Sequence, residues 1–85
     1  MAKYNLLIKR SAQKELEALP KGYLIPITKL IASLADDPRP QGCQKLSGEE
    51  KYRVRKGPYR IVYSIHDKEL IVWVVKIANR KEVYR

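Results

Sequence analysis

The stretch KYRVRKGPYRIVY, residues 51–63, constrains the fold most, because it has the pattern of a β-hairpin. Successive side chains of a strand point to opposite faces, so Arg53 and Arg55 are predicted on one face and Val54 on the other. Lys56-Gly57-Pro58 supplies the chemistry of a turn. We therefore expect two antiparallel strands at about 51–56 and 59–66.

Three arginines are concentrated on this hairpin, since Arg60 follows Arg53 and Arg55 at the start of the second strand. A hydrophobic core does not need them, whereas guanidinium groups bind phosphate oxygens in pairs and neighbouring rings stack on unstacked bases. Alternatively, Arg53 and Arg55 form the solvated face of an edge strand. Arg60 fits that alternative less well, because it stands between Tyr59 and Tyr63 in an otherwise hydrophobic strand.

The rest of the chain predicts one α+β domain spanning residues 1–85. A short strand at 3–9 precedes a helix at 12–19, with Ser11 as its N-cap. A second helix ends near Ala35, and it either starts near Ile25, with Pro26 in its first turn, or is kinked at Pro26. Both helices carry apolar residues at three- and four-residue spacing, which predicts one buried apolar stripe on each. Residues 41–50 are expected to be a loop anchored by Leu46. The apolar run LIVWVVKI at 70–77 is expected to be a central strand, with Trp73 in the core.

These elements give the order β-α-α-β-β-β, with a short last strand near 80–84 as an option. Two helices in the first half of the chain are expected to pack on one face of a small antiparallel sheet. The other face is then left available for binding.

Composition narrows the class of function. The chain has 85 residues, one cysteine and one histidine, so an internal disulfide framework and a cysteine-based metal site are excluded. It has no apolar run long enough to span a membrane, and its first residues do not resemble a signal peptide. We therefore expect a cytoplasmic protein without a metal or other cofactor. His66 is expected to be exposed in a turn, and Cys43 has no partner for nucleophilic catalysis.

The formal net charge of +9 is distributed unevenly. Residues 1–38 carry six Lys or Arg and four acids, or +2, and residues 39–85 carry twelve Lys or Arg and five acids, or +7. A positive excess on the predicted sheet suggests an anionic partner, which charge alone leaves open as nucleic acid, a membrane surface or an acidic protein. The excess does not lie on an amphipathic helix, as membrane-surface binding would favour.

A phosphodiesterase built from these residues would lack both a metal site and a well-placed histidine base. Its tools would be arginine clamps, a tyrosine hydroxyl, and the nucleophile that RNA itself carries, the 2′-hydroxyl. Such an enzyme is expected to be weak on free RNA and to need another body that holds the substrate in line.

The segment from Tyr52 to Tyr63, together with the closing NRKEVY at 79–84, resembles the RelE/ParE superfamily of toxins from toxin–antitoxin pairs. The resemblance extends over nearly the whole chain. It implies a ribonuclease, or mRNA interferase, that acts on messenger RNA in the ribosomal decoding site without metal. It also implies binding to the ribosome and to a cognate antitoxin, with a heterotetramer as one assembly.

The resemblance carries site roles to particular positions. Basic residues, commonly lysines, stand in RelE members where Arg53 and Arg55 stand here, and arginine at these positions removes a group able to act as a base. Arginines at 60 and 80 and a tyrosine at 84 match the remaining positions. The implied catalytic residues are thus Arg53, Arg55, Arg60, Arg80 and Tyr84, and the implied RNA-binding residues are Lys51, Lys56 and Lys81.

Two other functions share this sequence pattern. The ParE branch of the superfamily contains protein-binding poisons of DNA gyrase, which need no terminal tyrosine. A domain that binds RNA without cleaving it would present the same basic sheet. The combination of the five candidate catalytic residues favours the nuclease.

Overall fold

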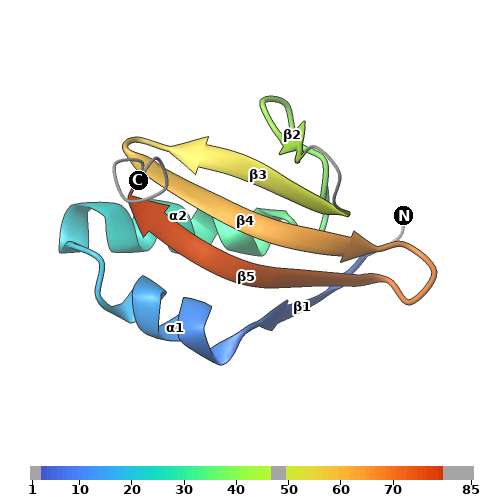
Figure 1. Cartoon of the computed structure of the whole chain (residues 1–85), viewed down its shortest axis with the longest axis horizontal. Coiled ribbons are helices and arrows are strands. Elements are labelled where there is room, and N and C mark those ends of the chain that lie inside the picture. Colours follow the sequence, from blue (N-terminus) through green and yellow to red (C-terminus); the bar gives the residue numbers. More distant parts are fainter. Residues whose placement is uncertain (1–2, 47–49, 80–85) are drawn as a thin grey trace.

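The computed structural model of the protein describes residues 3–46 and 50–79, which form two helices and one five-stranded sheet (Figure 1). The spatial order of the strands is β1-β5-β4-β3-β2. This architecture confirms the predicted α+β class. In chain order the elements are β1 (Asn5–Ile8), α1 (Arg10–Glu17), α2 (Lys21–Ser33), β2 (Gln44–Lys45), β3 (Lys51–Lys56), β4 (Tyr59–His66) and β5 (Ile71–Asn79).

The predicted hairpin is present as β3 and β4, which pair antiparallel from Lys51 opposite Ser64 to Lys56 opposite Tyr59. β1 differs from the expectation of an antiparallel sheet, because it runs parallel to β5. Parallel neighbours need a long connection, and the elements between β1 and β5 supply one. The stretch at 41–50 also contains a short strand, β2, paired with β3. The optional last strand near 80–84 lies outside the described residues.

The start of α1 differs from the prediction. Its N-cap is Lys9, whose side chain makes no capping hydrogen bond. The Lys9 amide still donates to the carbonyl oxygen of Val74 on β5, at 2.8 Å, so the chain leaves the sheet and enters the helix within one residue. Ser11 therefore lies inside the first turn and is not the cap. The predicted apolar stripe is confirmed, with Ala12 and Leu16 buried.

α2 begins directly after Pro20 and contains Pro26 in its interior. Of the two interpretations of Pro26, the one that starts the helix near Ile25 is therefore wrong. The apolar stripe of α2 is as predicted, since Ile27 and Ile31 are buried, and Leu34 just after the helix is fully buried.

The core lies between the two helices and one face of the sheet. Buried residues of α1 and α2 meet Val54, Ile61, Tyr63, Val72, Val74 and Ile77. We call this the helix face and the opposite one the outer face. A register shift between Val62 and Tyr63 leaves Val75 as an extra residue in β5, and this shift brings both Val74 and Ile77 onto the helix face.

The prediction for Trp73 is wrong, because its side chain is 43% exposed. Val72 and Val74 occupy the helix face, so Trp73 between them must point to the outer face. β5 is thus a central strand covered on one side, and its almost wholly apolar sequence suggested cover on both. Neither helix among the described residues is long and apolar enough to cross a membrane.

Candidate nucleic-acid interface

The hairpin register brings the predicted arginines together. Arg55 on β3 lies directly opposite Arg60 on β4, and Arg53 lies opposite Val62. Val54 between the two β3 arginines is buried on the helix face, so Arg53, Arg55 and Arg60 share the outer face. Like charges placed directly across a ladder repel each other, and a bound anion would relieve that repulsion.

Arg60 is the buried member of this group, with 7% exposure. Its other neighbour across the sheet is Ala78 of β5, so the small side chain of alanine borders the arginine on that side. A buried guanidinium keeps fewer rotamers than an exposed one, which favours a fixed geometry toward an anion. Arg55 is exposed and Arg53 is half-buried.

Gln44 of β2 orients Arg53. The guanidinium donates through Nε to Gln44 Oε1 at 3.1 Å, and its Nη2 contacts the same oxygen. The strand β2, which the sequence did not predict, thus fixes one of the predicted site residues. Gly42, Gln44, Arg53 and Arg55 line a small hollow of about 110 Å³ at this corner of the sheet.

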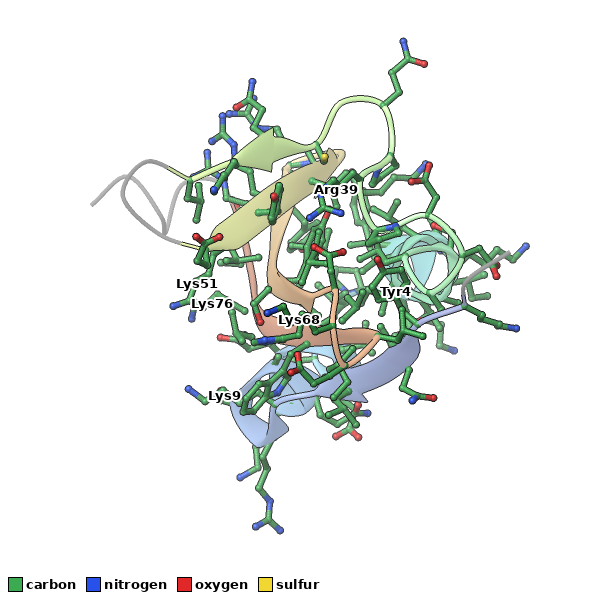
Figure 2. All side chains as sticks on the ribbon, turned by 90° about the vertical axis from the view of Figure 1, so that its right-hand side faces the viewer. Tyr4, Lys9, Arg39, Lys51, Lys68 and Lys76 are labelled. Carbon is green, nitrogen blue, oxygen red and sulfur yellow. The ribbon has the colours of Figure 1, made fainter. Side chains whose placement is uncertain are left out.

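The two predicted RNA-binding lysines on β3, Lys51 and Lys56, lie on opposite faces of the sheet. Lys51 pairs with Ser64 and lies on the outer face, where Figure 2 shows it with Lys76 on the side of the sheet away from α2. Lys56 lies opposite Tyr59 at the hairpin end, and its alternation with Arg55 places it on the helix face. The structure therefore removes Lys56 from the group around the arginines. Arg80, Lys81 and Tyr84 lie outside the described residues.

A polar cluster behind the hairpin holds it in position. Arg39 forms a two-pronged ion pair with Asp67, at 2.9 and 3.2 Å, and Tyr4 donates to the same carboxylate at 2.6 Å. The guanidinium of Arg39 also lies 5.2 Å from the ring centroid of Tyr52 on β3. The hydrogen bonds from Arg39 and then from Tyr4 lower the pKa of Asp67 to about 2.

Tyr63 connects this cluster to the core. Its hydroxyl donates to the carbonyl oxygen of Pro38 at 2.8 Å, and its ring stacks on Tyr52 with centroids 6.1 Å apart. Burial is the largest cause of a raised Tyr63 pKa. Tyr63 is fully buried and Tyr59 half-buried, and both side chains pack against the core on the helix face. No local pattern predicts the contact of Arg39 with Asp67, because it joins loops 28 residues apart.

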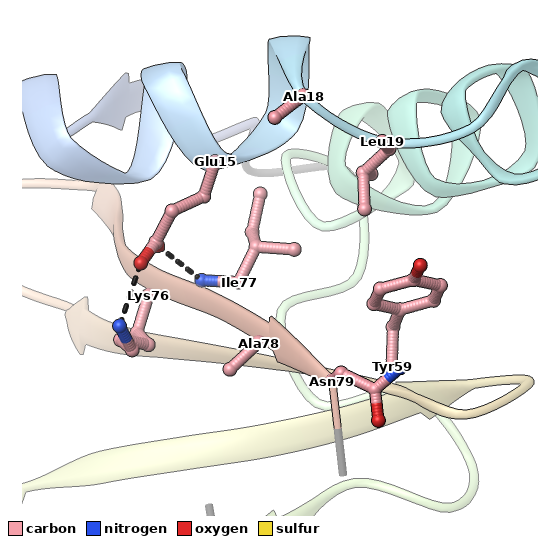
Figure 3. Close-up of a pocket in the computed structure, with 8 residues that line it drawn as sticks. All are labelled: Glu15, Ala18, Leu19, Tyr59, Lys76, Ile77, Ala78 and Asn79. Atoms are coloured by element: carbon pink, nitrogen blue, oxygen red, sulfur yellow. Dashed lines mark hydrogen bonds and ion pairs between the residues drawn. The ribbon is translucent and has the colours of Figure 1, made fainter. Parts of the chain in front are cut away.

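A larger hollow of about 280 Å³ lies between α1 and the far end of β5 (Figure 3). Glu15 of α1 accepts from the Lys76 ammonium at 2.6 Å and from the Ile77 backbone amide at 2.9 Å. Beyond Val74, no described strand pairs with this edge of β5. The remaining lining residues are Ala18, Leu19, Tyr59, Ala78 and Asn79.

No group of three or more His, Cys, Asp or Glu side chains suited to a metal ion occurs within residues 3–46 and 50–79.

Residues 6–84 match the family described as the ParE toxin of the type II toxin–antitoxin system parDE. The chain belongs to the RelE/ParE toxin superfamily. It is 32% identical, over 98% of its length and 97% of the relative's, to the "Putative toxin RelE1" of Methanocaldococcus jannaschii. It is therefore a type II toxin, as the resemblance of its hairpin and closing segment implied.

Two solved RelE structures have the same fold. The RelE–RelB complex of Pyrococcus horikoshii OT3 aligns with a TM-score of 0.82 at 29% identity, over 94% of this chain and 97% of that one. The isolated Escherichia coli RelE toxin aligns with a TM-score of 0.79 at 28% identity, over 95% and 90% of the two chains. The outer-face arginines therefore belong to a RelE-like toxin fold.

Proposed function

We propose that this toxin is a ribosome-dependent endoribonuclease that cleaves messenger RNA in the decoding site. The observation that carries the proposal is the cluster of Arg53, Arg55 and Arg60 on the outer face, with Arg55 directly opposite Arg60. Two guanidinium groups across one ladder can bind the oxygens of a single phosphate from two sides. The similarity to RelE toxins supports the same function.

In the proposed reaction the RNA 2′-oxygen attacks the adjacent phosphorus while the bond from phosphorus to the 5′-oxygen breaks. The 2′-hydroxyl loses its proton and the leaving 5′-oxygen takes up one from water, so the products are a 2′,3′-cyclic phosphate and a 5′-hydroxyl end. The arginines stabilise the negative charge that develops on the phosphate oxygens. Arginine keeps its proton at neutral pH, so these three residues act as clamps and not as bases.

Arg80 and Tyr84 complete the proposed site. Asn79 ends β5 opposite Tyr59, beside the row that contains Arg55, Arg60 and Ala78, and Arg80 follows it directly in the sequence. Tyr84 is the proposed group that takes the 2′-hydroxyl proton or stacks on the base beside the cut. Nothing in this reaction requires a metal, and the ribosome holds the message in line for attack.

The decisive experiment is to express the toxin briefly in cells and map the 5′ ends of transcripts. Cuts in register with translated codons, each leaving a 5′-hydroxyl, are expected. Arg55→Ala should abolish most cuts, whereas Lys29→Ala, which removes an exposed charge from α2, should leave them unchanged. Cuts at untranslated positions or no cuts at all would contradict the proposal.

A gyrase poison is the second candidate function, because the matched family description is that of a ParE toxin. The same experiment in induced cells distinguishes the nuclease from the gyrase poison. Broken or relaxed DNA without codon-registered cuts would establish the gyrase function. If the cells show neither DNA damage nor such cuts, but the protein still binds RNA, it is a binding domain without catalysis.

We further propose that an antitoxin holds this toxin in the cytoplasm of its host. The P. horikoshii RelE was crystallised in complex with RelB, and the +9 charge of this chain suits an acidic partner. An acidic segment that folds on binding could cover both charged and apolar surfaces. Strong expression of the isolated chain without a growth defect would count against an antitoxin requirement.

A further inference from the structure

Trp73 lies in a row of four side chains that crosses the outer face of the sheet. In register, Leu7 of β1 pairs with Trp73 of β5, Trp73 pairs with Ser64 of β4, and Ser64 pairs with Lys51 of β3. Leu7 is 49% exposed and Trp73 43%. Exposed single apolar residues need no explanation, but two adjacent ones on a functional face do.

Polar groups border the indole ring on the β4 side. Ser64 Oγ and His66 Nε2 lie 3.1 Å apart, and both side chains belong to the outer face by register. Lys51 continues the row on β3. The ring is thus flanked by an apolar neighbour on one side, and by hydrogen-bonding and cationic groups on the other. This arrangement suits a flat ligand that has a π-face, polar edges and a nearby negative charge.

The row of Trp73 lies on the same face as the arginine cluster. Ser64 and Arg60 are four residues apart along β4, or about 13 Å at about 3.3 Å per residue. None of the strand residues that the described register places on the outer face is acidic, whereas Lys51, Arg53, Arg55 and Arg60 are basic. Lys76 is basic as well, but its ammonium is paired with Glu15 of α1. A polyanion held at the arginines can therefore continue along the sheet to Trp73 without passing a carboxylate on these strands.

We propose that Trp73 is a stacking platform for a nucleobase of single-stranded RNA, on the strand whose phosphate the arginine cluster holds. Ser64 and His66 face the edge of that base, and Lys51 faces its phosphate. This inference rests on the proposed function, because it requires the outer face to bind RNA. It adds a contact away from the cleaved bond, so its role is binding and not chemistry.

The chain reports on this contact directly, because Trp73 is its single tryptophan. The probe is a short single-stranded oligoribonucleotide with 2′-O-methyl groups, which cannot undergo attack by its own 2′-hydroxyl. Saturable quenching of Trp73 fluorescence at low salt is expected. Binding of a labelled oligonucleotide without any change in Trp73 fluorescence would overturn the proposal, as would the absence of binding.

Variants at Trp73 separate stacking from apolar contact. Trp73→Phe keeps an aromatic face and should retain most of the affinity. Trp73→Leu keeps only an apolar side chain and should weaken binding on the order of 10-fold, as expected for the loss of one base stack. Ile25→Ser is the matched control, since Ile25 is 62% exposed on α2 and should have no effect. If Trp73→Phe and Trp73→Leu weaken RNA binding equally, the stacking role of Trp73 is contradicted.

A cleavage assay on programmed ribosomes distinguishes failure of this inference from failure of the proposed function. Trp73→Leu should raise KM several-fold and leave single-turnover cleavage at saturation nearly unchanged. If the wild type cleaves and Trp73→Leu cleaves with the same KM, the proposed function stands and the Trp73 inference falls. If an acidic partner protein, and not RNA, changes Trp73 fluorescence, the surface belongs to that protein and the inference falls as well.

Discussion

Arg55 and Arg60 lie directly opposite each other across the β3–β4 ladder, on the face that the helices leave open. One of them is exposed and the other is 7% exposed, so the pair combines a solvent-accessible guanidinium with a buried one. A sheet that places two cations in register loses stability unless an anion or another group offsets the repulsion. This relationship is the structural basis of the proposed phosphate site.

The first prediction concerns the unequal contributions of Arg60 and Arg53 to the cleavage rate. Arg60→Ala should lower cleavage of ribosome-bound message by about 10²–10³-fold, as for the loss of one preorganised donor. Arg53→Ala should cost less, because two of the Arg53 nitrogens already contact Gln44. Single-turnover rates measure both effects, and circular dichroism must show an intact fold for the buried Arg60 position. Equal losses in the two variants would contradict this ranking.

The second prediction concerns the hydroxyl of Tyr84. Its proposed role is to take the proton of the RNA 2′-hydroxyl in the chemical step. Tyr84→Phe should therefore reduce single-turnover cleavage strongly while ribosome binding is unchanged. A loss confined to Tyr84→Ala would indicate stacking, and no loss in either variant would remove Tyr84 from the site.

The third prediction concerns acid stability. The folded-state pKa of Asp67 is about 2, below its ordinary value of 3.8. A depressed carboxyl pKa stabilises the fold above pH 4, and this contribution is lost as the pH falls from about 4 toward 2. Asp67→Asn should lower the Tm at pH 7 and flatten the acid dependence between pH 4 and 2.

The control for Asp67 is Glu69→Gln, which neutralises an exposed carboxylate in the same turn. Its Tm should stay close to that of the wild type. Arg39→Gln should reproduce the Asp67→Asn result, since it removes the other half of the ion pair. A wild-type Tm profile in Asp67→Asn would show that the cluster does not hold the hairpin.

The fourth prediction concerns the hairpin turn. Gly57 has φ +58°, and a Cβ at this position would lie 2.6 Å from Cε1 of Tyr23 on α2. Gly57→Ala should destabilise the fold by about 1–3 kcal/mol, from left-handed backbone strain and displacement of the ring. Denaturant unfolding measures this change.

Gly22→Ala is the matched control for Gly57, because a Cβ at Gly22 meets nothing within 4 Å. Since Gly22 lies in α2, the substitution should be neutral or stabilising, by up to about 1 kcal/mol. The double variant Gly57→Ala/Tyr23→Ala should add less destabilisation than the two single changes combined. Additive effects would show that Tyr23 is not the obstacle.

Local patterns in the sequence predicted the hairpin, the helix stripes and the shared face of Arg53 and Arg55, whereas the placement of Arg60 on that face follows from the register of the ladder. The alternation around Val54 and the turn at Gly57 are properties of neighbouring residues, so they can be derived without tertiary structure. Trp73 could not be placed in this way. An apolar run does not reveal whether a strand is covered on one side or both, and only the position of both helices on one side decides it.

Long-range contacts could not be predicted from the sequence either. The β2 strand exists because Gln44 and Lys45 pair with β3, and it is this pairing that brings Gln44 to Arg53. The parallel pairing of β1 with β5 joins segments more than 60 residues apart. Such contacts depend on the assembled fold, so no local pattern at residues 41–46 or 5–8 predicts them.

The two contacts of Glu15 have a consequence for how this chain behaves when it is concentrated. An exposed sheet edge offers free backbone groups to which a second chain can add a strand, which is a common start of aggregation. Here the Glu15 carboxylate already occupies the Ile77 amide at the edge of β5, and the Lys76 ammonium lies beside it. Glu15 thus withdraws one backbone donor of this edge from an incoming strand and leaves two charged groups beside it.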